Sequence, residues 1–478
     1  MTKGDRLMII EKKNGSGKFD VVVAGAGLGG LTAANVLAKR GRKTLLLEQH
    51  FQLGGLATCF RRKKHVFDVA LHGFPVGMKK TLRKYWSKEM AERIVQVPSI
   101  RFDNPQFSLD TTFTKEHFTE ILEDKFQVER SVVDAFFAEL DAMNYYDDRS
   151  MTNRELFEKY FPGRNDVVRL LMEPITYANG STLDEPAITY GIVFSNFMSK
   201  GVYTFLGGTD AMIDMMLREL RGNGVEIRTT ARLEKVDFDR KGRVAAAVVD
   251  GKTIECDAVL SNGNLISTAR EWAGLDRFSK EFVEKIEAVR LNNSSCQVYF
   301  GLKPGESIDP MGDLLFTSTH PVFEPEAILS KNVTSRTYSL YYPSIRPERE
   351  PDHTIVASMN AEFADWRDLE GDAYETAKKK LADESLADLE NRIPGISDKL
   401  DHIEVATPKT FKRYTLHGGG ASFGTKFEGL DVSMGLPKEI PGLFHAGSVG
   451  IIMSGWLGAA NYGVIVANNV DTYLDTGK

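Results

Sequence analysis

The first residues with an evident chemical role form a glycine pattern near the N-terminus. Residues 25–30 read Gly-Ala-Gly-Leu-Gly-Gly and follow the apolar run Val21–Ala24. Gly25 is expected to make a tight turn, Gly27 to let the backbone approach a diphosphate, and Gly30 to let a helix pack on a strand. A helix that begins at such a turn offers free N–H groups to the phosphates. The spacing therefore predicts a dinucleotide-binding site.

The elements around these glycines follow the order that such a site requires. Apolar residues at helical spacing come next and end at Gly41, where a helix C-terminus is expected. A second apolar strand, 43–48, closes with Glu48, eighteen residues after Gly30. An acidic side chain at this distance reaches a ribose hydroxyl, and it speaks against a ribose phosphate. A glycine-rich turn in an ordinary α/β protein would not need all of these features in register.

The opposite end of the chain holds a second unusual stretch. Residues Ile440 to Val470 contain no Asp, Glu, Lys or Arg. A membrane-spanning helix needs roughly 20 apolar residues, so the run is long enough. Its many glycines and three asparagines argue against that interpretation, since Gly is a poor helix former and each amide would need a partner inside hydrocarbon. We expect a strand, a tight turn and a helix that are buried inside the protein.

The segment 51–74, FQLGGLATCFRRKKHVFDVALHGF, carries a resemblance to a known family. It resembles the FAD-dependent amine oxidase superfamily, and in particular the branch of phytoene desaturases, carotenoid isomerases and retinol saturases. In that family a second double glycine closes over the diphosphate, and Gly54-Gly55 matches it. The family commonly has Arg directly after this pair, whereas this chain has Leu56. The resemblance implies that the dinucleotide is FAD.

Further matches lie downstream of the double glycine. Phe67-Asp68 matches an aromatic–Asp pair that precedes a turn near the isoalloxazine, and His72-Gly73 resembles that turn in the retinol saturase and carotenoid isomerase branch. An ordinary loop histidine is the simpler interpretation of His72. Leu233 stands where a family Val contacts the adenosine.

The charge-free stretch matches the last motif of the same family. Gly447-Ser448 stands where the family has a Gly-Asp pair at the ribityl chain, and Gly455-Trp456-Leu457 opens a helix directed at the pyrimidine edge of the flavin. The N–H groups at a helix N-terminus stabilise the negative charge of reduced flavin. Charged side chains would be unfavourable beside the apolar ring system, which accounts for their absence.

The resemblance and the motifs together name the expected site. The candidates for residues close to the reacting ring are His72, Tyr414 and Trp456, and no metal ligand spacing is present. The expected FAD contacts are Gly25, Ala26, Gly27, Leu28, Gly29, Gly30, Glu48, Gln49, Gly54, Gly55, Leu56, Ala57, Leu233, Gly447, Ser448, Gly455, Trp456 and Leu457.

The fold class that follows is α/β. We expect a Rossmann-like FAD-binding domain of the amine oxidase and phytoene desaturase type, with an interleaved α+β substrate lobe. The expected FAD-binding segments are 19–75, 203–265 and 406–478, the substrate-binding segments are 76–202 and 266–405, and residues 1–18 form a flexible leader.

Composition limits the remaining classes. A net charge of −6 over 478 residues gives no reason to expect a nucleic acid partner. The three cysteines are scattered and no secretion signal precedes them, so a cytoplasmic protein without a transmembrane segment is expected. The basic cluster 61–65 leaves open a peripheral contact with anionic lipid.

The reaction is inferred from the resemblance. Thr407-Pro408, Thr410 and Arg413-Tyr414 look like the carotenoid desaturase, carotenoid isomerase and retinol saturase group. In that group, flavin N5 exchanges hydride with carbon–carbon bonds of a long apolar polyene or isoprenoid. Desaturation, saturation and isomerisation all remain open at this point.

Two other functions are weighed against this one. A flavin amine oxidase would have an aromatic pair facing the flavin in a short polar pocket and a Lys near N5, whereas a lipid enzyme would have a long apolar tunnel. A non-catalytic flavoprotein that binds lipid or a protein partner is the third interpretation.

Overall fold

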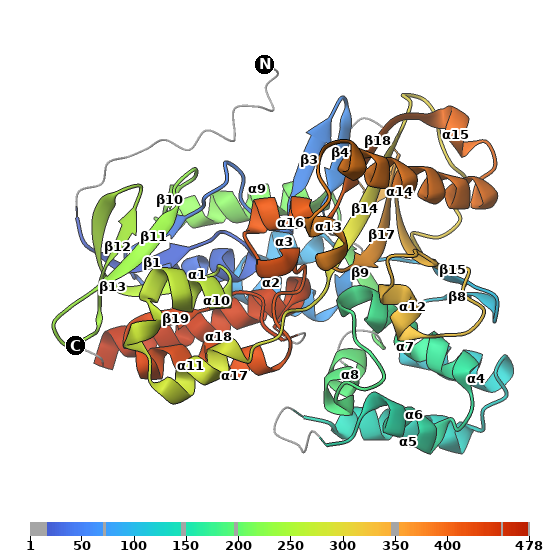
Figure 1. Cartoon of the computed structure of the whole chain (residues 1–478), viewed down its shortest axis with the longest axis horizontal. Coiled ribbons are helices and arrows are strands. Elements are labelled where there is room, and N and C mark those ends of the chain that lie inside the picture. The colour runs from blue at the N-terminus through green and yellow to red at the C-terminus, as the bar shows by residue number, and fades with distance from the viewer. Residues whose placement is uncertain are drawn as a thin grey trace.

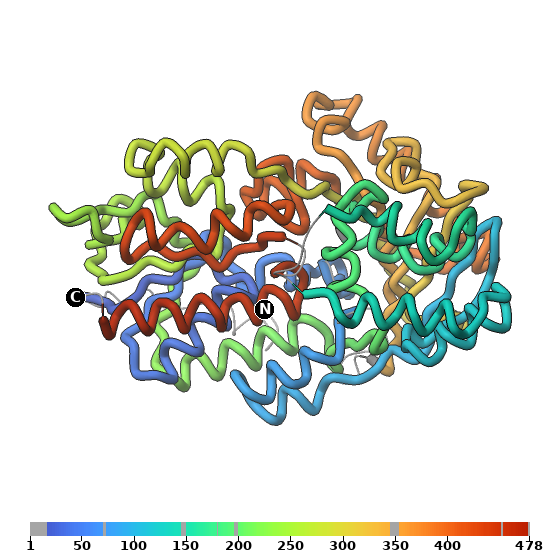
Figure 2. The backbone as a smooth tube through the Cα atoms, turned by 90° about the horizontal axis from the view of Figure 1, so that it is seen from below, coloured from blue at the N-terminus to red at the C-terminus, as the bar shows by residue number. Residues whose placement is uncertain are grey.

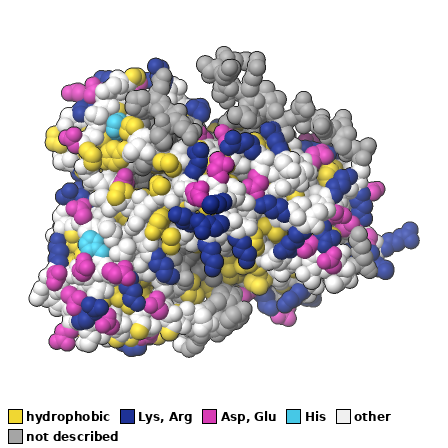
Figure 3. Space-filling view, turned by 180° about the vertical axis from the view of Figure 1, so that it is seen from behind, with side chains coloured by type: hydrophobic (Ala, Val, Ile, Leu, Met, Phe, Trp, Pro, Cys, Tyr) yellow, Lys and Arg dark blue, Asp and Glu magenta, His cyan; other side chains and the backbone are white. Residues whose placement is uncertain are grey.

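Two seven-stranded sheets organise the part of the chain that the computed structural model describes, residues 17–69, 73–144, 150–195, 199–345, 353–450 and 453–476 (Figure 1). One sheet lies on the left of Figure 1, and the other lies on the right. Acidic and basic side chains are interspersed on the face shown in Figure 3, so this face has no charge field of a single sign.

The first sheet has a parallel centre. Its strands β1, β2, β10, β13 and β19 run parallel, and β11 and β12 extend it in antiparallel fashion. Strands β1 and β2 are almost wholly buried, as the continuous apolar runs of strands covered on both faces require. The bounds are β1 Phe19–Ala24, β2 Thr44–Leu47, β10 Glu226–Arg228, β11 Leu233–Phe238, β12 Val244–Val249, β13 Lys252–Ser261 and β19 Leu443–His445.

The second sheet is mainly antiparallel, in the order β18-β14-β17-β16-β15-β7-β8. Helix α14, Gly371–Arg392, packs on one of its faces. The strands are β7 Ile100–Asp103, β8 Ser108–Thr111, β14 Ser294–Leu302, β15 Leu314–Ser318, β16 Ser335–Tyr341, β17 Thr354–Ala361 and β18 Leu400–Ala406.

A group of helices covers the other face of the second sheet. Their apolar side chains share an aromatic-rich core with strands β7 and β15, and the group lies at the lower right of Figure 1. The helices are α4 Lys115–Asp124, α5 Arg130–Ala142, α6 Asn153–Tyr160, α7 Asn165–Asn179 and α8 Ala187–Val193.

Shorter elements connect these layers. They are β3 Cys59–Arg62, β4 His65–Asp68, β5 Phe74–Pro75, α2 Gly77–Tyr85, α3 Lys88–Glu92, β6 Ile94–Gln96, β9 Val202–Phe205, α9 Gly208–Gly222, α10 Leu265–Ser267, η3 Thr268–Ala273, η4 Leu275–Arg277, α11 Lys280–Glu287, α12 Pro325–Leu329, η5 Pro343–Ile345, α13 Ala364–Arg367, α15 Ile396–Lys399, α16 Pro408–Thr415, η6 Gly418–Gly420 and α17 Glu428–Glu439.

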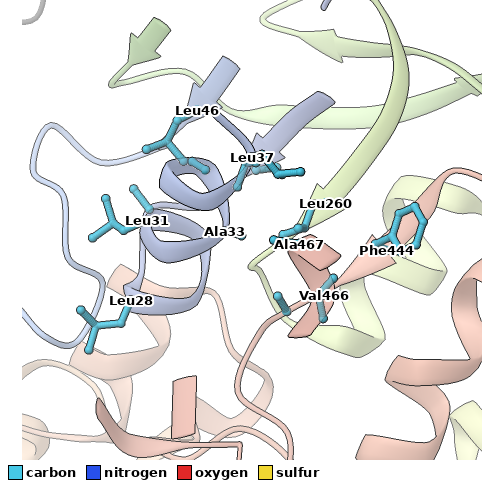
Figure 4. Close-up of a cluster of buried hydrophobic side chains, with 14 of the residues drawn as sticks. Leu28, Leu31, Ala33, Leu37, Leu46, Leu260, Phe444, Val466 and Ala467 are labelled. Carbon is cyan, nitrogen blue, oxygen red and sulfur yellow. The ribbon is translucent and has the colours of Figure 1, made fainter. Parts of the chain in front are cut away.

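The two ends of the chain meet where helix α1, Leu28–Lys39, crosses helix α18, Gly455–Thr476. Figure 2 shows the red C-terminal helix lying along the blue N-terminal segment. A Cβ atom added to Gly463 would lie 2.3 Å from the carbonyl oxygen of Gly29, so the two backbones are in direct contact. Figure 4 shows the apolar side chains around this crossing, among them Leu31 of α1 and Ala467 of α18.

The charge-free stretch near the C-terminus is buried in this packing. It forms strand β19 and most of helix α18, in agreement with the expected strand and helix. Among the helices of the described residues, none combines the length and apolar character that a membrane crossing requires.

The strands follow the expected division of the chain, whose boundaries stay a prediction. Every strand of the first sheet lies in 19–75, 203–265 or 406–478, and the second sheet is built from the other two segments up to Ala406. The hairpin β3–β4 nevertheless contacts the second sheet, because His65 Nε2 lies 2.6 Å from Oδ1 of Asp401 in β18.

The helix crossing gives a stability prediction. Gly463→Ala should lower the free energy of unfolding by about 2 kcal/mol, since the added methyl group meets backbone that cannot move away cheaply. Thermal unfolding of the purified protein measures this change. Gly222→Ala is the control, because a Cβ there meets nothing within 4 Å, and this variant should be as stable as the parent or slightly more. Equal stability of the two variants would contradict the backbone contact.

Candidate functional site

A cavity of about 1570 Å³ is lined by residues from both ends of the chain. Gly25–Gly29 line it from the first sheet, and Gly455–Leu457 line it from the start of α18. The expected contacts that line this cavity are Gly25, Ala26, Gly27, Leu28, Gly29, Glu48, Gln49, Gly54, Gly55, Leu56, Ala57, Leu233, Ser448, Gly455, Trp456 and Leu457.

The glycine turn has the geometry that its spacing predicts. Gly25 has a φ of 104°, and a Cβ on Gly30 would lie 2.0 Å from the Gly25 carbonyl oxygen. Gly27 is the N-cap of α1 and provides no side-chain hydrogen bond, and the first turn has no acidic residue. The N–H groups of that turn are therefore available to an anion in the cavity.

The double glycine lies on this turn. The N–H of Gly54 donates to the carbonyl oxygen of Ala26 at 2.8 Å, and a Cβ on Gly55 would lie 3.1 Å from the Cα of Gly27. Both positions have positive φ angles, which glycine adopts without strain. The two glycine motifs thus form one continuous backbone surface.

Glu48 is oriented by backbone N–H groups. One carboxylate oxygen accepts from Ala26 N at 2.8 Å, and the other accepts from His50 N at 2.9 Å. The side chain is only 9% exposed, and burial raises the pKa of Glu48, while the N–H groups act in the opposite direction. The carboxylate is thus held at the cavity wall, where a ribose hydroxyl could donate to it.

Asn262 joins the two ends of the chain and was missed by sequence reasoning as a site residue. Its Nδ2 donates to the carbonyl oxygen of Ala446 at 2.6 Å, and its backbone N–H donates to Ala24. A Cβ on Gly27 or Gly29 would lie within 2.8 Å of its amide atoms. The available sequence signal is the position of Asn262 directly after strand β13.

The N-terminus of α18 also opens at the cavity. Gly455 has a φ of 65°, and the first turn carries no acidic side chain. The Trp456 ring is stacked on Phe74, with centroids 5.1 Å apart and planes inclined by 16°. The free N–H groups at the start of α18 therefore face an uncharged, partly aromatic part of the cavity.

Two expected contacts contribute by packing instead of lining the cavity. Gly30 allows the close approach to Gly25 described above. A Cβ on Gly447 would lie 2.3 Å from the Gly263 carbonyl oxygen and 2.6 Å from His445 Nε2. Gly30 thus packs as its place in the glycine pattern predicts, and contacts of Gly30 and Gly447 with FAD stay a prediction.

The three candidates near the reacting ring have different outcomes. His72 lies outside the described residues. Tyr414, on α16, is 51% exposed, and its ring lies edge-on against His50 with centroids 5.5 Å apart. The backbone N–H of His50 donates to Glu48, so this contact places Tyr414 near Glu48, and a role for Tyr414 at the ring stays a prediction. Trp456 lies at the start of α18.

The second sheet contributes residues that sequence reasoning did not select. Gln297 and Tyr299 of β14 line the cavity, and the Tyr299 hydroxyl donates to Gln297 Oε1. Burial raises the pKa of Tyr299, so the phenol is neutral. The polar–apolar alternation along β14 was the available signal.

A buried ion pair lies beside the same cavity. On α7, Arg169 is 1% exposed, and its Nε lies 3.3 Å from Glu173. Burial raises the pKa of Glu173 to about 7, against the opposing effect of Arg169. Tyr177, one turn further along, lines the cavity and donates to the Thr317 carbonyl oxygen at 2.6 Å. Arg169 also donates to Gln106 and to the His320 carbonyl oxygen, and these hydrogen bonds tie α7, which forms part of the wall, to neighbouring segments.

These features fit FAD. Two helix N-termini without acidic side chains suit the diphosphate and the flavin, and the Glu48 carboxylate suits the ribose. Within the described residues there is no group of three or more His, Cys, Asp or Glu side chains that could hold a metal ion.

Comparisons with known proteins agree with this geometry. Residues 28–449 match the family described as flavin containing amine oxidoreductase. Prolycopene isomerase from Daucus carota is 24% identical, with 95% of this chain and 80% of that protein covered. Human all-trans-retinol 13,14-reductase is 20% identical, with 92% of this chain and 84% of that protein covered. The lycopene-forming phytoene desaturase of a Paracoccus strain is 23% identical, with 84% of this chain and 86% of that protein covered.

Solved structures share the fold. An oxidoreductase from Methanosarcina mazei has a TM-score of 0.65 at 19% identity, covering 96% of this chain and all of that chain. Wild-type putrescine oxidase bound to putrescine has a TM-score of 0.63 at 14% identity, covering 95% of this chain and 99% of that chain. At these identities the likeness shows the fold alone.

The position of Glu48 gives a prediction about cofactor affinity. Glu48→Gln should weaken FAD binding about tenfold, because a charge-assisted hydrogen bond to the ribose is lost. Titration of the apoprotein with FAD, followed by flavin fluorescence, measures the change. Glu226→Gln on the neighbouring strand β10, where Glu226 pairs with Arg228 outside the cavity, is the control and should bind FAD normally. Normal affinity in Glu48→Gln would contradict this position for the ribose.

The buried pair gives a prediction about pH. Between pH 4.5, the ordinary pKa, and about 7, the folded protein holds a proton on Glu173 that the unfolded chain releases. The contribution of Glu173 to stability therefore falls as the pH rises through this range and is level above it. The melting temperature of the parent minus that of Glu173→Gln should decrease from about pH 5 to about pH 8.

The control for this experiment is Glu139→Gln. Burial acts to raise the pKa of Glu139, but hydrogen bonds from Lys159 and Tyr160 hold it below its ordinary value. Glu139 is thus ionised in the folded state over this range, and above about pH 5.5 it is ionised in the unfolded chain as well, so the melting temperature of the parent minus that of Glu139→Gln should stay level from there upward. A difference for Glu173→Gln that rises with pH would show instead that the carboxylate is stabilised by Arg169.

Proposed function

The chain belongs to the family of flavin-containing amine oxidoreductases and is an FAD-dependent enzyme, and we propose that it exchanges hydride between flavin N5 and a carbon–carbon bond of a long, largely apolar polyene or isoprenoid. The observation that carries this proposal is one part of the cavity wall. This part, called the inner wall, is formed by β14–β17, α7 and α8, and the space beside it is the inner cavity. The described lining residues that come from β14–β17, α7 and α8 include no Asp, Glu, Lys, Arg or His. Hydride exchange at an unactivated carbon needs no such acid–base group.

FAD, when bound, supplies a centre that accepts or donates hydride. The chain contributes the surroundings of that centre. The N–H groups at the start of α18 stabilise negative charge, and the stacked rings of Trp456 and Phe74 exclude water from that side. The neutral Tyr299 hydroxyl is engaged by Gln297 and therefore offers no base.

The lysines that line the cavity lie on α14 and α16, which are not part of the inner wall. Lys409 Nζ donates to the Leu369 carbonyl oxygen at 2.7 Å, and Lys378 pairs with Glu375. Neither is placed on the inner wall, where an amine oxidase would need a Lys. This arrangement favours the isoprenoid enzyme over the amine oxidase.

The relatives support chemistry on carbon–carbon bonds. They are named as an isomerase, a 13,14-reductase and a desaturase, three reactions with different net electron balance. This chain is similar to all of them at comparable identity, so we leave the net direction to experiment.

The rim of the cavity supports entry of substrate from a membrane surface. Phe51, Tyr414 and Leu416 are exposed apolar residues that line the cavity. Lys412 and Arg413, on the same helix as Tyr414, line it as well. We propose a peripheral contact with an anionic lipid surface, since basic side chains around apolar ones suit such a surface.

Anaerobic mixing with candidate substrates tests the proposed function. The oxidised enzyme should be bleached by a partly saturated polyene if it desaturates, and the reduced enzyme should be reoxidised by a polyene if it saturates. An isomerase should convert a cis-polyene while its flavin stays reduced. Absorbance of the flavin and chromatography of the products measure these outcomes. Bleaching by a diamine or a monoamine, with no polyene active in any arm, would contradict the proposal.

A further inference from the structure

The second sheet presents a polar face to the cavity. Along β14 and β17, the residues at alternate positions Cys296, Val298, Ala357 and Met359 belong to the core shared with α14. The positions between them carry hydroxyl and amide side chains. In a two-layer protein this face would lie in solvent, but here helices cover it.

Strand register places these polar side chains in contiguous rows. Gln297 of β14 pairs with Ser358 of β17, and Ser358 pairs with Thr337 of β16. In the adjacent row, Ser295 pairs with Asn360. All five residues line the cavity, so together they form a polar floor.

The other side of the inner cavity is apolar. It is lined by Phe113, Pro174, Val193 and Val202, which come from or lie beside the helices that cover the sheet. The space between the two sides is thus amphipathic, and a pure hydrocarbon would meet an unsuitable surface on one side.

Part of the polar floor has hydrogen-bond partners within the protein. Asn360 Oδ1 accepts from Asn293, and Asn360 Nδ2 donates to the Thr176 carbonyl oxygen at 3.2 Å. Gln297 Oε1 accepts from Tyr299. These contacts orient the two amides, because both ends of the Asn360 amide and the oxygen of the Gln297 amide are held.

Thr337 differs from Asn360 and Gln297 in its hydrogen bonding. It is 5% exposed, and its hydroxyl has no hydrogen-bond partner among the described residues. A buried hydroxyl without a partner is unfavourable, and native proteins avoid it unless a ligand or water supplies the bond. Thr337 lines the cavity between Ser358 and the apolar Phe316 of β15, so a ligand bound there is the candidate for that partner.

We propose that the substrate is an oxygenated isoprenoid, with hydroxyl or carbonyl oxygens along one edge. Thr337, Ser358 and the amide of Gln297 hydrogen-bond these oxygens, and the hydrocarbon face of the substrate packs on Phe113 and Val193. The inference rests on the proposed function for the isoprenoid skeleton. It adds that this enzyme selects oxygen-bearing members of that class over hydrocarbons.

Matched ligand pairs test this selectivity. The FAD-loaded enzyme is titrated with zeaxanthin and β-carotene, which differ by two hydroxyl groups, and with retinol and its deoxy hydrocarbon analogue. Quenching of protein fluorescence by the polyene measures affinity without turnover. We expect the oxygenated member of at least one pair to bind about tenfold more tightly, as one or two hydrogen bonds would give.

A variant assigns this difference to the polar floor. Thr337→Val keeps the shape of the side chain and removes the hydroxyl, so it should lower affinity for the oxygenated ligand about fivefold and leave hydrocarbon affinity unchanged. Because the hydroxyl has no partner in the protein, the variant should melt at or above the temperature of the parent.

Thr317→Val is the matched control on the opposite face of the sheet. The Thr317 hydroxyl donates to the Arg336 carbonyl oxygen at 2.9 Å, so this variant should be less stable but should bind both ligands normally. Equal affinities within each pair, or an unchanged preference in Thr337→Val, would overturn the inference while the isoprenoid function stands. Failure of all four ligands to bind would overturn both.

Discussion

The direct backbone contact between α1 and α18 is the constraint on which the site depends. Only glycine at positions 29 and 463 lets the two helices approach so closely, since a Cβ on either residue would meet main-chain oxygen atoms. Because the helices begin close to their crossing, both N-termini open at the same cavity. Asn262 completes the arrangement by filling the space beside the glycines and hydrogen-bonding Ala446 from the other end of the chain.

The electrostatics of the cavity follow from this arrangement. Neither helix has an acidic residue in its first turn, so the positive ends of two helix dipoles face the cavity without compensation inside the protein. A cofactor with a diphosphate at one end and a ring that becomes anionic on reduction suits such a surface. The described lining residues that come from β14–β17, α7 and α8 include no Asp, Glu, Lys, Arg or His.

How much of the site could be predicted depends on whether the signal is local. The glycine turn and Glu48 were predictable because a tight turn, a helix start and a ribose acid occur within one short segment. The place of Tyr414 was less predictable because it depends on how α16 packs, and here its ring contacts His50. The close approach of Gly263 to Gly447 was not predictable either, because the two residues lie far apart in the chain. Gln297 and Thr337 were not selected, since hydroxyls and amides on a strand are usually solvent-facing.

The sequence by itself determined the FAD-binding fold, the nucleotide end of the site and the buried character of the charge-free C-terminal stretch. These features depend on backbone conformation and on apolar periodicity, which are specified by residues close together in the sequence. Only the tertiary structure decided that the second sheet turns its polar face inward to form the floor of the cavity. Alternation along a strand shows that two faces differ, but which face is enclosed depends on where distant helices pack.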